Sequence, residues 1–548
     1  MLSTALRLGL VVLLPAAAAL GAWFLPPRFS AVARIGGLAA LAVTLGFLAG
    51  SAQIVASGAR LAATFGAPVG GVRVLLRADP QGVIVAVAAC GAGLLCLARR
   101  GFSTTQTAGL LLCVTGALTA SLGGNAVMLF AGFELANAGT AAMLTAGGER
   151  SGRAVWLATA VQHAAGLALL TAAVELQTST GTSDFSVLPA DAVGPGIALL
   201  WLGAAGVRLV APGLYPGRRG VAYPAWAVAG AIPVAAIALL RFREAVSDHV
   251  PAAAGTTVAV LACVVAVVAA GAALRRGSAA APAGRALAVL AAAPAVAVAG
   301  VSGAPALTGL AAGLVAVEVA VALGAMWEPH PTGGRLVGAL AALSAGGLPV
   351  GAGAVALLLE LSALATAGRP VSLLLVPLGL AALAGAAAAA RLAAGFAGNQ
   401  GAAGHGLVQP VAAIALAAGG AAAVVPGLAV QTVVGPLATG NVARLAGAAT
   451  VLSPGGGWAG GYIAVAGVVL VVMLLAAGWL AEVTVRPAAA MSPHPVAGPL
   501  LPLHVFRRWH RALARSGPAL DAIDRWLLLQ PQLPMVVAVA VGALLVVH

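Results

Sequence analysis

Six ionisable residues lie inside long apolar stretches of this chain. They are Glu134, His163, Arg208, Glu318, Glu360 and Arg391. A charged side chain in the middle of a membrane-spanning helix costs about 2.5–3.5 kcal/mol on insertion scales, so such residues often belong to ion paths or buried ion pairs. We therefore predict proton or ion chemistry at these positions, and we identify no catalytic residue, metal site or cofactor motif.

Glu134 and Arg208 are the first candidates for an ion pair. Glu134 lies in the middle of NAVMLFAGFELANAGTAAML, with no opposite charge within one turn. It must pair with another helix, stay protonated or face water. Arg208, one turn before Pro212, needs a carboxylate or carbonyl partner. We predict that the two pair in the protein interior; the alternative is that Arg208 snorkels to a membrane interface through a proline-bent helix.

The other four groups are weaker candidates. Histidine side chains can change protonation near neutral pH, which makes His163 a candidate, although a lone histidine among apolar residues is often a hydrogen-bonded core residue. Glu318 and Glu360 have no basic residue nearby in sequence, and Glu360 is the better candidate of the two. Arg391 lies near a segment end, where snorkelling is the default.

The chain contains no lysine, and all 28 of its basic residues are arginine. Arginine keeps its proton at physiological pH, whereas a buried lysine can release and regain one. A relay of buried lysines is therefore impossible here.

One apolar segment contains a break. The run AGGLPVGAG includes Gly346, Gly347, Pro349 and Gly351 in the middle of a stretch that is otherwise suited to a helix. Interrupted helices in membranes often line a site or a cavity. The alternative is a tight turn between two shorter helices.

These residues must be positioned by membrane helices. The 548-residue chain is 61% apolar and 8% charged, with a mean hydropathy of +1.06. Roughly sixteen apolar stretches are long enough to cross the bilayer. They lie at about 5–25, 31–50, 81–98, 105–122, 124–147, 154–176, 195–212, 224–241, 255–274, 285–302, 305–326, 336–365, 371–396, 407–428, 459–483 and 526–547. We predict an all-α, polytopic membrane bundle of about 14–16 transmembrane helices.

Charge distribution orients this bundle. Arginines concentrate in alternate loops, except for Arg60, Arg73 and Arg77 after the second stretch. The positive-inside rule then predicts a multi-pass protein of the cell (inner or plasma) membrane with both termini on the non-cytoplasmic side and the first apolar run retained. The net charge of +14 reflects this orientation and the membrane lipid, and we expect no nucleic-acid partner.

Three regions follow from this organisation. Residues 1–70 form N-terminal helices, residues 71–430 form the core, and residues 431–548 form C-terminal helices. The last region includes a basic stretch at 486–525, which we interpret as an amphipathic segment on the cytoplasmic surface. The four cysteines, inside apolar stretches without paired spacing, predict buried thiols.

Ordered motifs between residues 73 and 430 resemble one family. They are RVLLRADPQG, LFAGFELANAG, WLATAVQHAAGLALL, STGTSDFSVL, GVRLVAPGLYP, LSAGGLPVGAG and GLVQPVAAIALAAGG. Their order is similar to that of the antiporter-like membrane subunits of respiratory complex I, multisubunit cation–proton antiporters and group 4 hydrogenases. The chain looks most like the large membrane subunit of formate hydrogenlyase.

The resemblance implies two inverted five-helix repeats, each with an interrupted helix, plus flanking helices. It also implies a short extracellular strand at Arg73–Gly82 and a glutamate–lysine pair that gates protons, with Arg208 where the lysine belongs. The chain departs from the family at Pro233, where a central lysine or histidine is expected. It departs again near Leu357, where a lysine is expected and Glu360 is the nearest ionisable group.

We therefore expect a membrane subunit of a complex I-like or hydrogenase-like respiratory complex, with other membrane subunits as partners. It takes part in, or structurally supports, proton (cation) translocation through a degenerate path, and any redox chemistry belongs to the partners. The alternatives are a stand-alone secondary transporter of an anionic solute and a purely structural membrane scaffold.

Overall fold

The computed structural model describes a bundle of long helices. It covers residues 3–56, 61–66, 73–98, 101–146, 152–189, 191–214, 225–246, 249–276, 280–303, 352–368 and 370–397, with single positions between 306 and 347. Within these residues, nine helices are long and apolar enough to cross a membrane. The prediction of a polytopic all-α membrane bundle is confirmed. The predicted region 431–548, with its basic stretch at 486–525, lies outside the described residues.

Most helices form where apolar runs were predicted, with ends that differ by up to six residues. The helices that begin at Ile232 and Ala352 start later than the predicted 224–241 and 336–365. The helices of the described residues are α1 (Thr4–Phe24), α2 (Ser30–Ala56), α3 (Pro80–Ala98), α4 (Thr104–Leu122), α5 (Ala126–Ala146), α6 (Gly152–Thr180), α7 (Pro195–Leu214), α9 (Ile232–Ala245), α10 (Ala252–Arg276), α11 (Ala280–Ala299), α14 (Ala352–Thr366) and α15 (Leu375–Ala397). Short 3-10 turns η1 (Pro27–Phe29) and η3 (Val371–Leu374) precede α2 and α15. Since bilayer thickness sets the length of a span, run length alone predicts these elements well.

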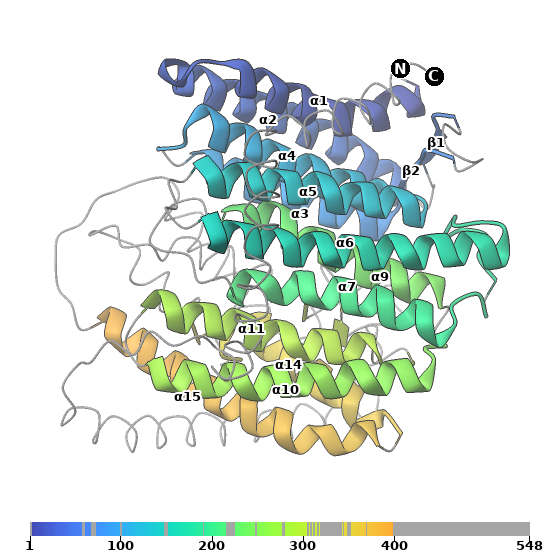
Figure 1. Cartoon of the computed structure of the whole chain (residues 1–548), viewed down its shortest axis with the longest axis vertical. Helices are drawn as coiled ribbons and strands as arrows, with labels where there is room; N and C mark the ends of the chain where they lie inside the picture. The colour runs from blue at the N-terminus through green and yellow to red at the C-terminus, as the bar shows by residue number, and fades with distance from the viewer. Residues whose placement is uncertain are drawn as a thin grey trace, which may run out of the picture.

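The helices lie side by side with their axes roughly aligned, and chain order runs across the bundle from α1 and α2 to α10 and α15 (Figure 1). A small antiparallel hairpin caps one end. Its strands are β1 (Leu61–Thr64) and β2 (Leu75–Ala78), with Leu61 opposite Ala78 and Thr64 opposite Leu75. β2 forms within Arg73–Gly82, where the resemblance implied a short strand.

Glycines let α4 and α5 pack closely against each other. A Cβ atom on Gly116 of α4 would lie 2.4 Å from the Ala136 nitrogen of α5, and one on Gly139 of α5 would lie 2.5 Å from the Gly109 carbonyl oxygen of α4. Small residues let backbones approach in lipid, where packing rather than water exclusion drives association. This contact fixes α5, the helix that carries Glu134.

The eighth span is irregular where the sequence has Pro233. A π-helical turn, η2 (Ala227–Ala231), precedes α9, and Pro233 lies in the first turn of α9. Proline lacks a backbone N–H and crowds the preceding turn, and the wider π-helical turn accommodates it. The indole of Trp201 on α7 donates to the Ala238 carbonyl at 3.0 Å, which ties α9 to its neighbour.

Candidate functional site

The central feature of the site is a bonded pair between two helices. Nδ1 of His163 on α6 lies 2.7 Å from Oε2 of Glu134 on α5, near the middle of both spans. The Glu134 side chain is 19% exposed and the His163 side chain 51%. The contact allows one hydrogen bond between a carboxylate oxygen and an imidazole nitrogen. His163 is thus hydrogen-bonded, as the alternative in the sequence analysis expected, but it is half exposed and not part of the core.

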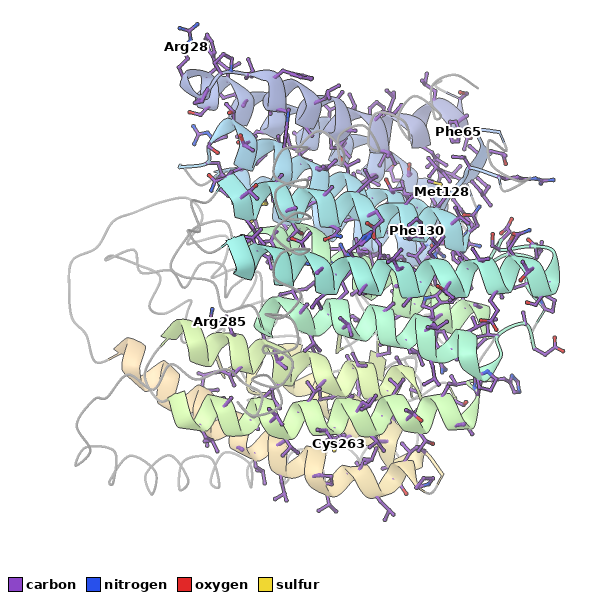
Figure 2. All side chains as sticks on the ribbon, in the orientation of Figure 1. Arg28, Phe65, Met128, Phe130, Cys263 and Arg285 are labelled. Atoms are coloured by element: carbon purple, nitrogen blue, oxygen red, sulfur yellow. The ribbon has the colours of Figure 1, made fainter. Side chains whose placement is uncertain are left out.

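A glycine on α6 makes room for the Glu134 carboxylate. A Cβ atom on Gly166 would lie 2.0 Å from Oε1 of Glu134 and 3.9 Å from the Phe130 ring. Figure 2 labels Phe130 between α5 and α6. Oε1 is buried and has no hydrogen-bond partner among the described residues. Gly166 and His163, three residues apart on one helix face, thus hold opposite sides of the same carboxylate.

Arg208 lies in the protein interior but does not pair directly with Glu134. Arg208 is fully buried on α7, and its guanidinium carbon lies 4.7 Å from the centre of the Phe133 ring. Its three nitrogens have no hydrogen-bond partner within the described part of the chain. Glu134 still acts on this charge at longer range.

The predicted direct Glu134–Arg208 ion pair is therefore corrected. The Glu134 carboxylate contacts His163 instead. The Arg208 guanidinium lies over the ring of Phe133, the residue before Glu134, in a cation–π contact. The snorkelling alternative also fails, because Arg208 is fully buried.

Two buried amides accompany these groups and escaped the sequence analysis. Asn137 lies one turn beyond Glu134 on α5, and Gln162 precedes His163 on α6; both are almost completely buried. Oδ1 of Asn137 and both polar atoms of the Gln162 amide have no partner among the residues described. Buried polar atoms normally find a partner or an ordered water. We call Glu134, Asn137, Gln162, His163 and Arg208 the α5–α7 polar set.

Glu360 lies apart from this set on α14. It is 2% exposed, and its Oε1 has no hydrogen-bond partner in the described residues. Its carboxylate also packs on glycine, since a Cβ atom on Gly313 would lie 1.9 Å from Oε1. In both Glu134 and Glu360, the carboxylate thus packs against a glycine of a neighbouring segment.

The predicted break lies just before α14. Gly346 and Gly347 form a turn, and Gly347 has a φ of 74°, a left-handed conformation that glycine adopts without strain. Pro349, Gly351 and Glu318 lie outside the described residues, as does the side chain of Arg391.

A second ionic cluster joins β2 to α9. Arg241 NH1 lies 2.6 Å from Asp79 Oδ2 and 2.8 Å from Glu244 Oε2, while Arg77 NH2 contacts Glu244 at 2.7 Å. Arg77 Nε lies 2.9 Å from Asp79 Oδ2. The Arg241 guanidinium also donates to the Ser121 carbonyl at 3.1 Å. Two carboxylates thus balance two guanidiniums.

This cluster also escaped the sequence analysis, although a signal existed. Arg77 is two residues before Asp79, and Arg241 is three residues before Glu244. Burial would raise the pKa of Asp79, but the Arg241 and Arg77 guanidiniums and the Gly82 N–H outweigh it, so the pKa lies below its usual range. Because its charge is neutralised, Arg77 is a poor guide to membrane orientation, which explains one exception to the arginine bias.

Within the described residues, no group of three or more His, Cys, Asp or Glu side chains is arranged to hold a metal ion. The four cysteines are free and buried, and Cys263 lies on α10 (Figure 2).

Solved structures with the same architecture come from membrane complexes. A chain of the Mrp complex from Dietzia sp. DQ12-45-1b superposes with a TM-score of 0.70 at 18% identity, over 94% of this chain and 60% of that one. A chain of the membrane-bound sulfane sulfur reductase, an archaeal respiratory membrane complex, gives 0.62 at 17% identity, over 75% of each chain. A chain of Thermus thermophilus respiratory complex I gives 0.57 at 20% identity, over 78% of this chain and 99% of that one.

The chain has the fold of these membrane subunits. It spans only 60% of the length of the Mrp chain. No protein-family profile and no curated protein sequence matches it. The predicted resemblance to the antiporter-like group is thus confirmed for the fold, while the particular closeness to formate hydrogenlyase stays a prediction.

Proposed function

We propose that this chain is a proton-translocating membrane subunit of a multisubunit respiratory-type complex in the cell membrane. The observation that carries the proposal is the Glu134–His163 contact of 2.7 Å between two membrane-spanning helices. The fold supports the same class, because similar chains occur in an Mrp complex, a sulfane sulfur reductase and complex I.

The pair has the properties of a proton-holding site. Carboxyl and imidazole groups can both donate and accept protons, and the short contact places the two groups within hydrogen-bond distance between α5 and α6. Arg208 keeps its own proton and acts as a fixed positive charge. It interacts electrostatically with Glu134 at long range and does not pass a proton on.

The rest of this path offers fewer titratable side chains than a relay of buried lysines would. The eighth span offers Pro233 and a π-helical turn rather than a titratable side chain. Glu360 is buried on a different part of the bundle. We propose that Glu134, His163, Glu318 and Glu360 are the titratable groups of this path, with Asn137 and Gln162 hydrogen-bonding water between helices.

The test is proton translocation by the intact complex in proteoliposomes. Glu134→Gln keeps the size of the side chain and removes its titration, so translocation should fall to the level of empty vesicles. Glu175→Gln is the matched control, because Glu175 is an exposed carboxylate near the end of α6. Unchanged translocation in Glu134→Gln would remove Glu134 from the path.

A second candidate is transport of an anionic solute, and one observation favours it. The three nitrogens of buried Arg208 have no partner among the described residues, and a small anion would satisfy them. This candidate predicts a stable monomer whose thermal stability rises with chloride, phosphate or a small carboxylate and returns to baseline in Arg208→Gln. Co-purification with other membrane subunits, and no response to these anions, supports the proton-translocating subunit instead.

A structural scaffold is the remaining alternative from the sequence. It predicts that Glu134→Gln combined with Arg208→Gln lowers thermal stability while translocation by the complex stays unchanged. The two readouts together therefore separate the three classes.

A further inference from the structure

Helix α6 differs from every other poorly buried span among the described residues. Five of the nine candidate spans have less than half of their residues buried. Four of these have mean hydropathies between 1.9 and 2.6, as expected of helices that face lipid. The α6 span Ala158–Thr180 is only 39% buried, yet its mean hydropathy is 1.2.

Polar residues lower the hydropathy of this span. They are His163, Thr171 and Glu175 at exposed positions and Gln162 in the interior. Its outer face carries His163, Ala164, Leu167, Thr171 and Val174 at helical spacing. The exposed face of α10, by contrast, is aliphatic apart from Thr257 and includes Val260, Leu261, Val264, Val267 and Val268. Figure 1 shows α6 on the near side of the bundle between α5 and α7, the helices against which it packs.

His163 is the group on this face that needs an external partner. The Thr171 hydroxyl donates to the Leu167 carbonyl within the helix and is satisfied there. The imidazole is 51% exposed and bonds Glu134 only through Nδ1. Its Nε2 atom is thus left to the outside, close to mid-span, where lipid tails offer no hydrogen bond.

We propose that the outer face of α6 is an interface for another membrane subunit of the complex. The partner contributes a transmembrane helix with a polar or ionisable side chain at the depth of His163, which hydrogen-bonds Nε2. This inference rests on the proposed membership in a multisubunit complex. It goes further by naming the face, its central residue and the chemistry of the partner.

The interface would also connect the α5–α7 polar set to the partner. Because His163 contacts Glu134 through Nδ1, a partner group on Nε2 would be one imidazole away from the half-buried carboxylate. Neutral small and aliphatic residues around His163, such as Ala164 and Leu167, allow a second helix to approach closely.

Site-specific photo-crosslinking in native membranes tests this interface. A photoreactive benzophenone amino acid replaces Leu167, which is 47% exposed and one turn beyond His163. The control carries it at Leu261 on α10, which is 60% exposed. We expect the Leu167 position to crosslink to a transmembrane segment of a different polypeptide that co-purifies with the chain, and the Leu261 position to react with lipid.

The crosslinked peptide decides the outcome by mass spectrometry. A partner segment with a polar or ionisable side chain within one turn of the crosslink supports the proposal. Adducts of the Leu167 position with lipid only, a soluble protein, a second copy of this chain or its own residues 398–548 would overturn it.

A steric variant gives an independent readout. Ala164→Trp places a large side chain on the proposed interface, and Val264→Trp places one on the exposed face of α10, where Val264 is 55% exposed. We expect Ala164→Trp to release the chain from the complex and Val264→Trp to leave it bound. Retention of both variants, or loss of both, contradicts a specific interface on α6.

These results separate from those on the proposed function. If Glu134→Gln abolishes translocation but the Leu167 position reacts only with lipid, the interface fails and the translocation proposal stands. If the crosslink forms but Glu134→Gln translocates normally, the interface stands and the proton path fails.

Discussion

Glu134 Oε2 and His163 Nδ1 lie 2.7 Å apart, each near the middle of a membrane-spanning helix. This relationship joins a half-buried carboxylate to an imidazole that is half exposed at the surface of the bundle. Isolated, either group would be costly at this depth; together they form a hydrogen bond. The contact therefore connects the outer face of α6, through the imidazole, to the carboxylate on α5.

Gly166 should be essential for the position of Glu134. Gly166→Ala would bring a methyl group within 2.0 Å of the present Oε1 position, so the carboxylate must move away from His163. Because the end of a flexible side chain yields, we expect a stability change below about 1–3 kcal/mol, the usual cost of overpacking, together with a clear loss of translocation. Thermal unfolding in detergent and transport in proteoliposomes measure the two effects.

The same substitution on α7 provides the control. Gly203 has open space around its Cβ direction, and alanine favours a helix interior by about 0.5–1 kcal/mol over glycine. Gly203→Ala should therefore be neutral or stabilising and transport normally. Equal transport by Gly166→Ala and Gly203→Ala would show that the carboxylate position does not matter.

We expect Arg208 to lower the stability of the folded protein and to support translocation. Its buried guanidinium has a cation–π contact with Phe133 but no ion or hydrogen-bond partner among the described residues. Replacement of buried ion pairs by apolar residues of similar volume is often neutral or stabilising by about 1–4 kcal/mol, and an unpaired buried charge has less attraction to offset its desolvation. Arg208→Met should therefore raise the unfolding temperature and lower translocation; a lower unfolding temperature would reveal a partner that stabilises the charge.

The ionic cluster at β2 and α9, in contrast to Arg208, should stabilise the folded protein. Arg241 is fully buried and contacts both Asp79 and Glu244. Removal of one partner from a buried pair typically costs about 3–5 kcal/mol. Arg241→Met should thus lower stability strongly in thermal unfolding, whereas Arg28→Ala, at an exposed site, should change it by less than about 0.5 kcal/mol. Similar small losses in both variants would argue against a stabilising cluster.

Asp79 should make stability sensitive to acid. Its pKa in the folded protein lies below the ordinary value of 3.8, so its contribution is complete above that value. The contribution is lost only as the pH falls through the lower folded-state pKa. Unfolding temperatures of Asp79→Asn and of the unmodified protein should therefore differ by a constant amount from pH 7 to pH 5, and the difference should shrink below about pH 4. A difference that already disappears between pH 7 and pH 5 would contradict the lowered pKa.

The helices were predictable because the bilayer imposes length and apolarity, so the predicted runs 81–98 and 124–147 agree closely with α3 (Pro80–Ala98) and α5 (Ala126–Ala146). The partner of each charge was not, because pairing depends on helix rotation and on neighbours. Glu134 and Arg208 were both identified as buried groups of interest. Only the packing of α5 on α6 reveals that His163 reaches the carboxylate first.

Irregular elements were the hardest to predict. The sequence shows Pro233 in the eighth span, but apolar periodicity does not distinguish a kinked α-helix from a π-helical turn. The buried amides of Asn137 and Gln162 carry no charge and so leave little signal in an apolar run. The cluster at Asp79 combines residues from distant segments, and only topology brings Arg77 and Glu244 within 2.7 Å.

The most direct test of the central claim is infrared difference spectroscopy of the intact complex during turnover. If Glu134 takes up and releases a proton, a carboxylic acid C=O band should appear or disappear between the resting and the working states. That band should be missing in Glu134→Gln and present in Glu175→Gln. The same carboxyl band at full amplitude in Glu134→Gln would contradict the claim, because the titrating carboxyl group would then lie elsewhere.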